Sequence, residues 1–395
     1  MTPARTLLFA IASGTAVANL YWSQPLLEEI GRSLGVSNAK AGTLLTVTQV
    51  GYALGILLVV PLGDVLDRRG LVPIVLTVSA VALGLVAAVP GFPLVLGALG
   101  LVGCTTVSAQ ILGPLAGDLA EPDQRGRVVG TVVSGGLIGI LLSRTIAGVV
   151  ADLAGWRSIY AVAAVAALLL AVALRRAIPE LPTRPGVPYP RLIASVFTQV
   201  RRRPSAQVTI VLSVVNFGVF TMFWTALTYL LSAEPYSYSL STIGLVGVAG
   251  LLGALAARGV GRLHDRGWSV PANGFTLTLA LLSMAAAGRF GHHVIALLVT
   301  IVVFDVAVQG TNVLSQTRLF AAAPEARSRL NTALVTANFV GAACGSAVAG
   351  VLWRAGGWNA VTLAGVIAYG VALLVWVVAR RSLRTQPPPR SVHPG

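Results

Sequence analysis

Two ionisable side chains lie deep inside long apolar stretches of the sequence. Asp305 comes about eleven residues into the stretch 294–317, and Arg144 lies late in the stretch 127–150. An ionised group at the centre of a bilayer costs about 2.5–3.5 kcal/mol on insertion scales, so both side chains should face protein or water. Asp305 is therefore a candidate proton carrier. Arg144 is a candidate counter-charge to it, or an anchor for an anionic substrate group, unless it only bonds backbone carbonyls or snorkels outward.

The residues that follow Asp305 extend its polar character along one face of a helix. Gln309, Asn312 and Gln316 come four, seven and eleven residues later, a spacing that places all four side chains on one side. Exposing such a stripe to lipid would cost free energy, because its polar groups would lose their hydrogen bonds. We expect it to line a cavity within the membrane; the alternative is that it bonds neighbouring helices.

Other apolar stretches carry isolated polar and aromatic residues. The polar candidates for the same cavity are Asn19, Gln24, Gln110 and Asn216. Phe217, Phe220 and Trp224 share a helical face at i, i+3 and i+7. An aromatic wall with few polar groups suits lipophilic substrates, cations among them. Plain helix packing would use the same aromatic residues.

The sequence contains no motif for chemistry on a bound substrate. Lys40, the single lysine, is followed by Ala41, which excludes a GxxxxGK[ST] phosphate-binding loop. Neither a serine hydrolase triad nor an HExxH motif is indicated. Cys104 and Cys344 lie far apart in apolar stretches, which is typical of buried apolar side chains rather than of a disulfide or metal pair. We therefore predict no enzyme activity, no metal site and no cofactor.

The composition requires that helices crossing a lipid bilayer position these residues. Of the 395 residues 55% are apolar and 10% are charged, whereas a soluble domain is about 25% charged. Apolar runs of roughly 20 residues recur, each long enough to cross about 30 Å of hydrocarbon. The sequence predicts an all-α membrane protein whose first span is not cleaved as a signal peptide. The twelve predicted spans are 7–29, 39–62, 71–90, 93–117, 127–150, 158–175, 206–231, 241–258, 270–288, 294–317, 330–353 and 359–379.

The net charge of +15 is distributed unequally between the two sides of the membrane. With the N-terminus inside, the inner segments hold 22 Lys and Arg residues and the outer loops hold 5, while Arg144 lies in a span. This pattern predicts that both termini are cytoplasmic in a cell (inner) membrane, and it explains the charge without a nucleic acid. We predict six-helix bundles at 1–178 and 206–382, a cytoplasmic linker at 179–205 and a disordered tail at 383–395.

The two halves repeat at offsets of 197 to 202 residues. Two six-helix bundles in parallel repeat imply a pseudo-twofold axis and a binding site between the bundles, near the middle of the bilayer. The matched pairs are Asn19 with Asn216, Asp67–Arg68 with Asp265–Arg266, Arg125 and Arg127 with Arg327 and Arg329, and Gly155–Trp156 with Gly357–Trp358.

These motifs resemble the major facilitator superfamily over essentially the whole chain. Its diagnostic loop between the second and third spans runs here from Gly63 to Gly70, and a second copy begins at Gly261. The resemblance implies that the charges of these loops close the inner side through contacts between the halves, although they could also simply terminate spans. The residues assigned to this gate are Gly63, Asp67, Arg68, Gly70, Arg125, Arg127, Asp265, Arg266, Arg327 and Arg329.

Within the superfamily the sequence is most similar to bacterial drug–proton antiporters, and residues 304–332 resemble an acriflavine-resistance-like subgroup. The fifth-span motif of such antiporters is altered, since residues 142–148 read LSRTIAG. The resemblance implies a secondary transporter that alternates access and exports small organic compounds in exchange for protons. Because one chain contains both halves, we expect a monomer. Carriers of sugars, nucleosides or amino acids remain alternatives, as do a membrane-embedded enzyme and a receptor or scaffold without transport.

Overall fold

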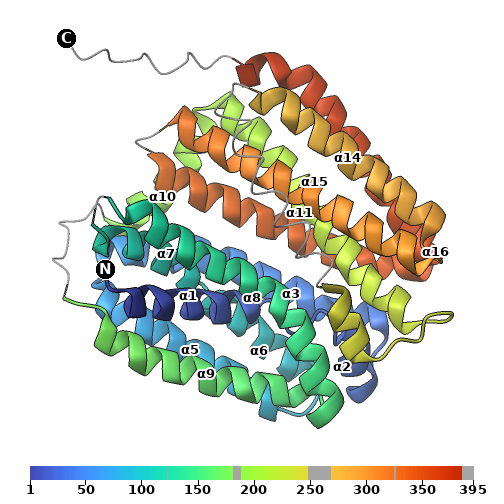
Figure 1. The fold of residues 1–395 in the computed structure, drawn as a ribbon, viewed down its shortest axis with the longest axis horizontal. Coiled ribbons are helices and arrows are strands. Elements are labelled where there is room, and N and C mark those ends of the chain that lie inside the picture. Colours follow the sequence, from blue (N-terminus) through green and yellow to red (C-terminus); the bar gives the residue numbers. More distant parts are fainter. Residues whose placement is uncertain (122, 181–187, 248–267, 324–325, 385–395) are drawn as a thin grey trace.

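The computed structural model describes the chain except for residues 122, 181–187, 248–267, 324–325 and 385–395. All regular secondary structure in the described residues is helical. Figure 1 shows the helices gathered into two bundles that lie against each other, the first half of the chain in blue to green and the second in yellow to red. The predicted fold class, an all-α membrane protein of two helical bundles, is confirmed.

The first bundle consists of long apolar helices with two short helices between them. The short helices are α2 (Leu27–Ser33) and α4 (Leu62–Val65). The long helices are α1 (Pro3–Ala18), α3 (Asn38–Leu58), α5 (Arg68–Ala88), α6 (Phe92–Thr105), α7 (Ser108–Leu119), α8 (Arg125–Ala154) and α9 (Trp156–Ala177).

The second bundle follows the connecting helix α10 (Tyr189–Arg201). It contains α11 (Pro204–Ser232), the helical residues 240–247, α14 (Ser269–Phe290), α15 (Val294–Ala322) and α16 (Arg327–Arg384). Helix α16 covers two predicted spans, which a break at Gly356 and Gly357 separates. Gly357 has a φ of 59°, a conformation that glycine adopts without steric cost. The eighth predicted span is described only up to residue 247.

Two predicted spans are not continuous helices. The span predicted over 7–29 is wrong after Ala18, because residues 19–26 form successive tight turns before α2 begins. Asn19 stabilises the first of these turns by accepting the indole N–H of Trp22 at 2.8 Å. The span predicted over 93–117 is split into α6 and α7 between Thr105 and Ser108. Both irregular segments carry polar residues inside otherwise apolar stretches: Asn19, Ser23 and Gln24 in the first, and Thr105, Thr106 and Ser108 in the second.

Glycines allow α1 to lie unusually close to α8 in the first bundle, and α11 to α16 in the second. A Cβ atom on Gly139 would come within 2.1 Å of the carbonyl oxygen of Gly14, and one on Gly345 within 2.0 Å of that of Gly218. Real Cβ atoms are never that close to a carbonyl oxygen, so only glycine fits. The same contact therefore occurs in both halves, as the internal repeat predicts.

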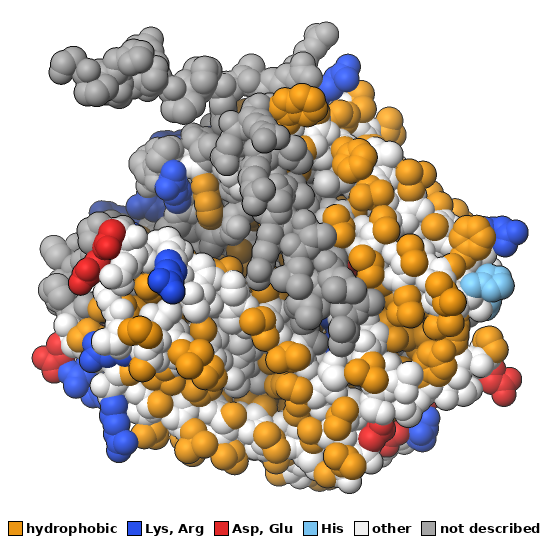
Figure 2. Space-filling model, viewed as in Figure 1, with side chains coloured by type: hydrophobic (Ala, Val, Ile, Leu, Met, Phe, Trp, Pro, Cys, Tyr) orange, Lys and Arg blue, Asp and Glu red, His pale blue; other side chains and the backbone are white. Residues whose placement is uncertain are grey.

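The outer surface of the bundles is apolar. Leu153 and Val378 are more than four-fifths exposed, and most large exposed hydrophobic side chains lie on the long helices. Figure 2 shows hydrophobic side chains spread across the described part of the face in view, with most of the charged ones toward its margins. Nine helices in the described residues are long and apolar enough to cross a membrane. This surface is the one that a multi-pass membrane protein presents to lipid.

The two bundles are closed against each other at one end. Helix α8 contacts residues 240–247 there: Asp152 accepts the backbone N–H of Ser241 at 2.9 Å, and a Cβ on Gly148 would come within 2.3 Å of the carbonyl oxygen of Leu240. We call this the closed end. The basic end is the opposite one, where the loops carry Arg68, Arg125 and Arg327.

We predict that Gly148→Ala opens the closed end. The added methyl group cannot fit beside Leu240, so the bundles should separate there. In a chain without Cys104 and Cys344, Thr46→Cys places a thiol on α3, where the hydroxyl of Thr46 lies 2.8 Å from that of Ser346 on α16. Reaction of this thiol with a membrane-impermeant reagent should become at least severalfold faster. Gly130→Ala on the same helix is the control, because its Cβ would meet no atom within 4 Å. Equal rates in both variants would contradict the prediction.

Candidate functional site

Asp305 lies in the interior of the second bundle, at the boundary with the first. It is on α15, its side chain is buried, and its Oδ1 accepts the indole N–H of Trp224 at 3.3 Å. Trp224 is on α11 and is also buried. The expectation that Asp305 does not face lipid is therefore confirmed.

Arg144 reaches the same tryptophan from the first bundle. Its guanidinium carbon lies 4.0 Å from the ring centroid of Trp224 and 5.6 Å from that of Tyr21. Its Nε donates to Oε1 of Gln24 at 3.0 Å. Arg144 is 98% buried, so its side chain does not snorkel outward. It also bonds no backbone carbonyl of the described residues.

Trp224 lies between a cation and a carboxylate that come from different halves of the chain. Arg144 and Asp305 are close enough to interact electrostatically, but they form no direct ion pair. The face of an indole ring is electron-rich and its N–H edge is electron-poor. A cation at the face and a carboxylate at the edge therefore both match the ring. The sequence indicated Trp224 as part of an aromatic wall but gave no sign of this bridging position.

A small cavity adjoins this group. Its volume is about 10 Å³, roughly the space of one water molecule. Gln24, Arg144, Trp224 and Thr228 are among its lining residues. The Nη2 atom of Arg144 is buried and has no hydrogen-bond partner. One donor of the guanidinium thus remains available to a ligand.

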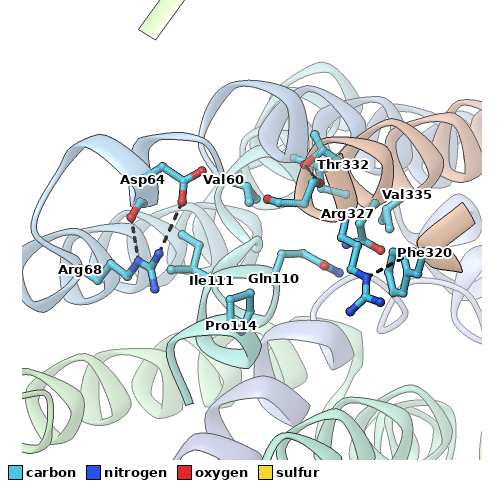
Figure 3. A pocket seen from close by; sticks show the side chains of 14 residues that line it. Val60, Asp64, Arg68, Gln110, Ile111, Pro114, Phe320, Arg327, Thr332 and Val335 are labelled. Atoms are coloured by element: carbon cyan, nitrogen blue, oxygen red, sulfur yellow. Dashed lines mark hydrogen bonds and ion pairs between the residues drawn. The ribbon is translucent and has the colours of Figure 1, made fainter. Parts of the chain in front are cut away.

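A larger cavity opens at the basic end between the bundles. Its volume is about 260 Å³. Figure 3 shows Asp64 and Arg68 of the first half on one side, Arg327 and Phe320 of the second half on the other, and Gln110 between them. Gln110 donates to the hydroxyl of Tyr52 at 3.2 Å. The molecule is thus open at this end and closed at the other.

Aromatic side chains connect this cavity with the buried charges. The ring centroids of Tyr52 and Phe339 are 4.3 Å apart, and those of Phe339 and Phe217 are 6.1 Å apart. The ring centroids of Phe217 and Phe220 are 6.0 Å apart, and those of Phe220 and Trp224 are 6.4 Å apart. The shared face of Phe217, Phe220 and Trp224 is confirmed. Tyr52 and Phe339, which extend it toward the cavity, were not identified from the sequence, because they lie in segments that are distant in the chain.

The remaining polar candidates divide into packing residues and residues near the interface. Asn216 donates to the carbonyl oxygen of Val308 at 3.1 Å and accepts from Tyr369 at 3.0 Å, so it joins three helices. Asn19 is used in the turn described above. Gln316 donates to Asn331 at 3.1 Å, which supports the structural alternative for that end of the stripe. Gln309 and Asn312 are half-buried.

Among the residues that the structure describes, the loop charges form contacts within one half in this conformation, not across the interface. Arg68 donates to the carbonyl oxygen of Gly63 at 2.7 Å, to Asp118 at 2.9 Å and to Asp64 at 3.4 Å. Asp67 caps α5 by accepting the N–H of Arg69 at 3.0 Å. The sequence did not indicate Asp118, whose position in a helix end near Arg68 depends on tertiary packing.

The other predicted gate residues contribute little to these contacts. Arg125 adds an ion pair with Asp118 at 3.6 Å, and Arg327 donates to the carbonyl oxygen of Phe320 at 3.2 Å. Arg127 is exposed and Arg329 is half-buried. A Cβ on Gly70 would meet no atom within 4 Å. Gly261, Asp265 and Arg266 lie outside the described residues.

Fold and site together define a multi-pass membrane protein whose two helical bundles enclose a central polar group and are open at one end. The chain belongs to the Major Facilitator Superfamily, whose family model matches residues 9–288. It is therefore a transporter of small molecules across a membrane, and members of this superfamily are not in general enzymes.

The chain is 42% identical over 377 residues to an uncharacterized transporter, YgaY, of Escherichia coli O157:H7, and the match covers 95% of each chain. It is 32% identical over 356 residues to a probable transporter of Streptomyces coelicolor, covering 90% of this chain and 82% of that one. These bacterial relatives imply location in the inner membrane.

Solved structures confirm the fold. A bacterial homolog of the human lysosomal transporter Spinster has a TM-score of 0.80 at 14% identity, covering 98% of this chain and 100% of that one. The nucleoside transporter NupG has a TM-score of 0.77 at 14% identity, covering 95% and 99%.

We predict a graded loss of stability for two substitutions of Trp224. Trp224→Phe keeps a ring beside Arg144 but removes the hydrogen bond to Asp305, which should cost about 0.6 kcal/mol within a membrane. Trp224→Leu also removes the cation–π contact, worth about 2 kcal/mol where the cation is desolvated, and should cost more. Thermal unfolding of the purified protein measures both variants.

Trp376 supplies the control for this pair. Its indole N–H bonds the carbonyl oxygen of Val270 at 3.1 Å, away from the buried charges. Trp376→Phe should therefore resemble Trp224→Phe in stability. Equal stabilities of Trp224→Phe and Trp224→Leu would show that the ring contributes nothing to holding Arg144.

Proposed function

We propose that this protein exports small, largely apolar organic compounds in exchange for protons, with Asp305 as the proton carrier. The observation that carries the proposal is the buried group of Arg144, Trp224 and Asp305, which joins the two halves next to the closed end. Enclosing a carboxylate within a membrane protein costs free energy, so such residues usually have a close partner and a function. Here its partner is an indole from its own half, which in turn holds a cation of the other half.

The charge distribution supports an orientation for this conformation. The basic end carries most of the arginines, and such ends face the cytoplasm. Both termini would then be cytoplasmic, and the open cavity lined by Arg68 and Arg327 would face inward. Closure of that end would bring the gate residues of the two halves together, as the resemblance implies. A single chain contains both halves, so a monomer suffices.

Proton occupancy of Asp305 can influence the contact between the halves. As a carboxylate it accepts the Trp224 N–H and attracts Arg144; once protonated, it loses the negative charge that favours both interactions. The ring of Trp224 is then held less firmly beside Arg144. Because these contacts lie beside the closed end, loading a proton would favour its opening.

The lining of the inward path supports an apolar substrate. Between the cavity and Trp224 lie the contacting rings of Tyr52, Phe339, Phe217 and Phe220, which a substrate moving between the two would meet. Aromatic walls bind apolar molecules and cations by surface contact rather than by directed hydrogen bonds. This lining agrees with the resemblance to drug–proton antiporters.

A second candidate is transport of organic anions by the same site. Arg144 lines the small cavity beside Trp224, and its unpartnered Nη2 is suited to bind a carboxylate. A thermal-shift screen of the purified protein across organic cations, anions, sugars and nucleosides would distinguish the two candidates. Stabilisation by anions alone, lost in Arg144→Gln, would favour the second one.

We predict that Asp305→Asn uncouples transport from the proton gradient. The amide keeps an acceptor oxygen for Trp224 but does not exchange a proton, so a compound found in the screen should still bind. In proteoliposomes, its accumulation against a concentration gradient should fall to the level reached without a pH gradient. Facilitated exchange of the labelled compound should persist.

Asp123→Asn serves as the control, since Asp123 is an exposed carboxylate at the basic end. It should accumulate the compound as the unmodified protein does. Unchanged pH dependence in Asp305→Asn would exclude Asp305 as the carrier. Accumulation that survives collapse of the proton gradient in the unmodified protein would contradict antiport itself.

A further inference from the structure

A second buried polar group lies inside the second bundle, apart from the site described above. Ser269, Asn273 and Thr276 share one face of α14 at i, i+4 and i+7. Helix α15 presents Thr311, Ser315 and Arg318 at the same spacing, and the two faces meet. The hydroxyl of Thr311 donates to that of Thr276 at 2.8 Å, and Nη2 of Arg318 donates to Oδ1 of Asn273 at 3.3 Å. We call these six residues the polar seam.

The polar seam is fully enclosed, and much of its hydrogen-bonding capacity is unused. Each of the six side chains is at least nine-tenths buried. The atoms that are buried without a hydrogen-bond partner are Ser269 Oγ, Asn273 Nδ2, Ser315 Oγ, Arg318 Nε and Arg318 Nη1. A buried polar atom without a partner destabilises the folded state, so five in one seam point to a bound species.

The charge of the polar seam specifies the kind of species. Arg318 is 97% buried and has no ion pair with any carboxylate in the described residues. Arg68 in the first bundle shows the usual solution, because it contacts both Asp64 and Asp118. A buried cation without a counter-charge strongly destabilises the folded state. The three unpartnered nitrogen groups, two of Arg318 and one of Asn273, can only donate hydrogen bonds.

We propose that the polar seam binds one small inorganic anion of halide size. The anion would accept hydrogen bonds from the free N–H groups of Arg318 and Asn273 and from the hydroxyls of Ser269 and Ser315. A neutral water molecule would accept only two of these bonds and leave the guanidinium charge uncompensated. The bound anion belongs to the structure of the second bundle and is not the transported substrate, since the polar seam is separate from the cavity at the basic end.

Chloride is the probe for this site. The purified full-length protein should become more stable to heat as chloride replaces gluconate at constant ionic strength, and the effect should saturate. Arg318→Gln should abolish the saturable part. Arg201→Gln, which removes an exposed arginine of α10, should retain it. Transport is not measured, so the outcome is independent of the proposed function.

Asn273→Asp tests the charge argument even if Arg318→Gln does not fold. It places a carboxylate at hydrogen-bond distance from Arg318 and thereby supplies the missing counter-charge within the chain. We expect this variant to be at least as stable in gluconate as the unmodified protein is in saturating chloride, and to have lost its chloride dependence.

Three results would overturn the anion site. The first is equal stability of the unmodified protein in chloride and gluconate. The second is a chloride effect that survives in both Arg318→Gln and Asn273→Asp. The third is a chloride dependence that appears only after Asp265→Asn, because a carboxylate of the chain would then be the counter-charge of Arg318.

Discussion

The cost of enclosing charge away from water is the constraint on which the rest of this structure depends. Arg144 and Asp305 are both buried at the interface of the two bundles, and each would be expensive there alone. Trp224 makes their burial possible by presenting its face to the cation and its N–H to the carboxylate. Because the cation belongs to one half and the carboxylate to the other, satisfying these charges also holds the halves together.

The two ends of the molecule use different contacts, and this difference is suited to alternating access. The closed end relies on backbone contacts that only glycine permits, together with a few hydrogen bonds such as that from Ser241 to Asp152. The basic end keeps its charges inside the first half, where Arg68 is held by Asp118 and Asp64. Contacts of these kinds can form and break without disturbing the cores of the bundles, because those of the closed end lie between the bundles and those of Arg68 lie at a helix end.

The periodicity of apolar residues was sufficient to predict the helical membrane fold, the two halves and the burial of Asp305, because each follows from the requirement that lipid faces apolar atoms. It was not sufficient to predict the turns after Ala18 or the division of the fourth span, where a few polar residues such as Asn19 and Thr106 interrupt a mainly apolar stretch and form side-chain hydrogen bonds. Spacing along one helix also failed to distinguish Asn216, which joins three helices, from residues such as Gln110 that border a cavity.

The sequence by itself determined which residues face away from lipid, which loops are basic and where the chain repeats, since these properties depend on the period of a helix and on the solvation of charge. Only the tertiary structure decided the partners: Trp224 between Arg144 and Asp305, Asp118 beside Arg68, and Arg318 against Asn273. These residues are distant along the chain, and the direction in which two packed helices turn their faces is set by the fit of all their side chains together.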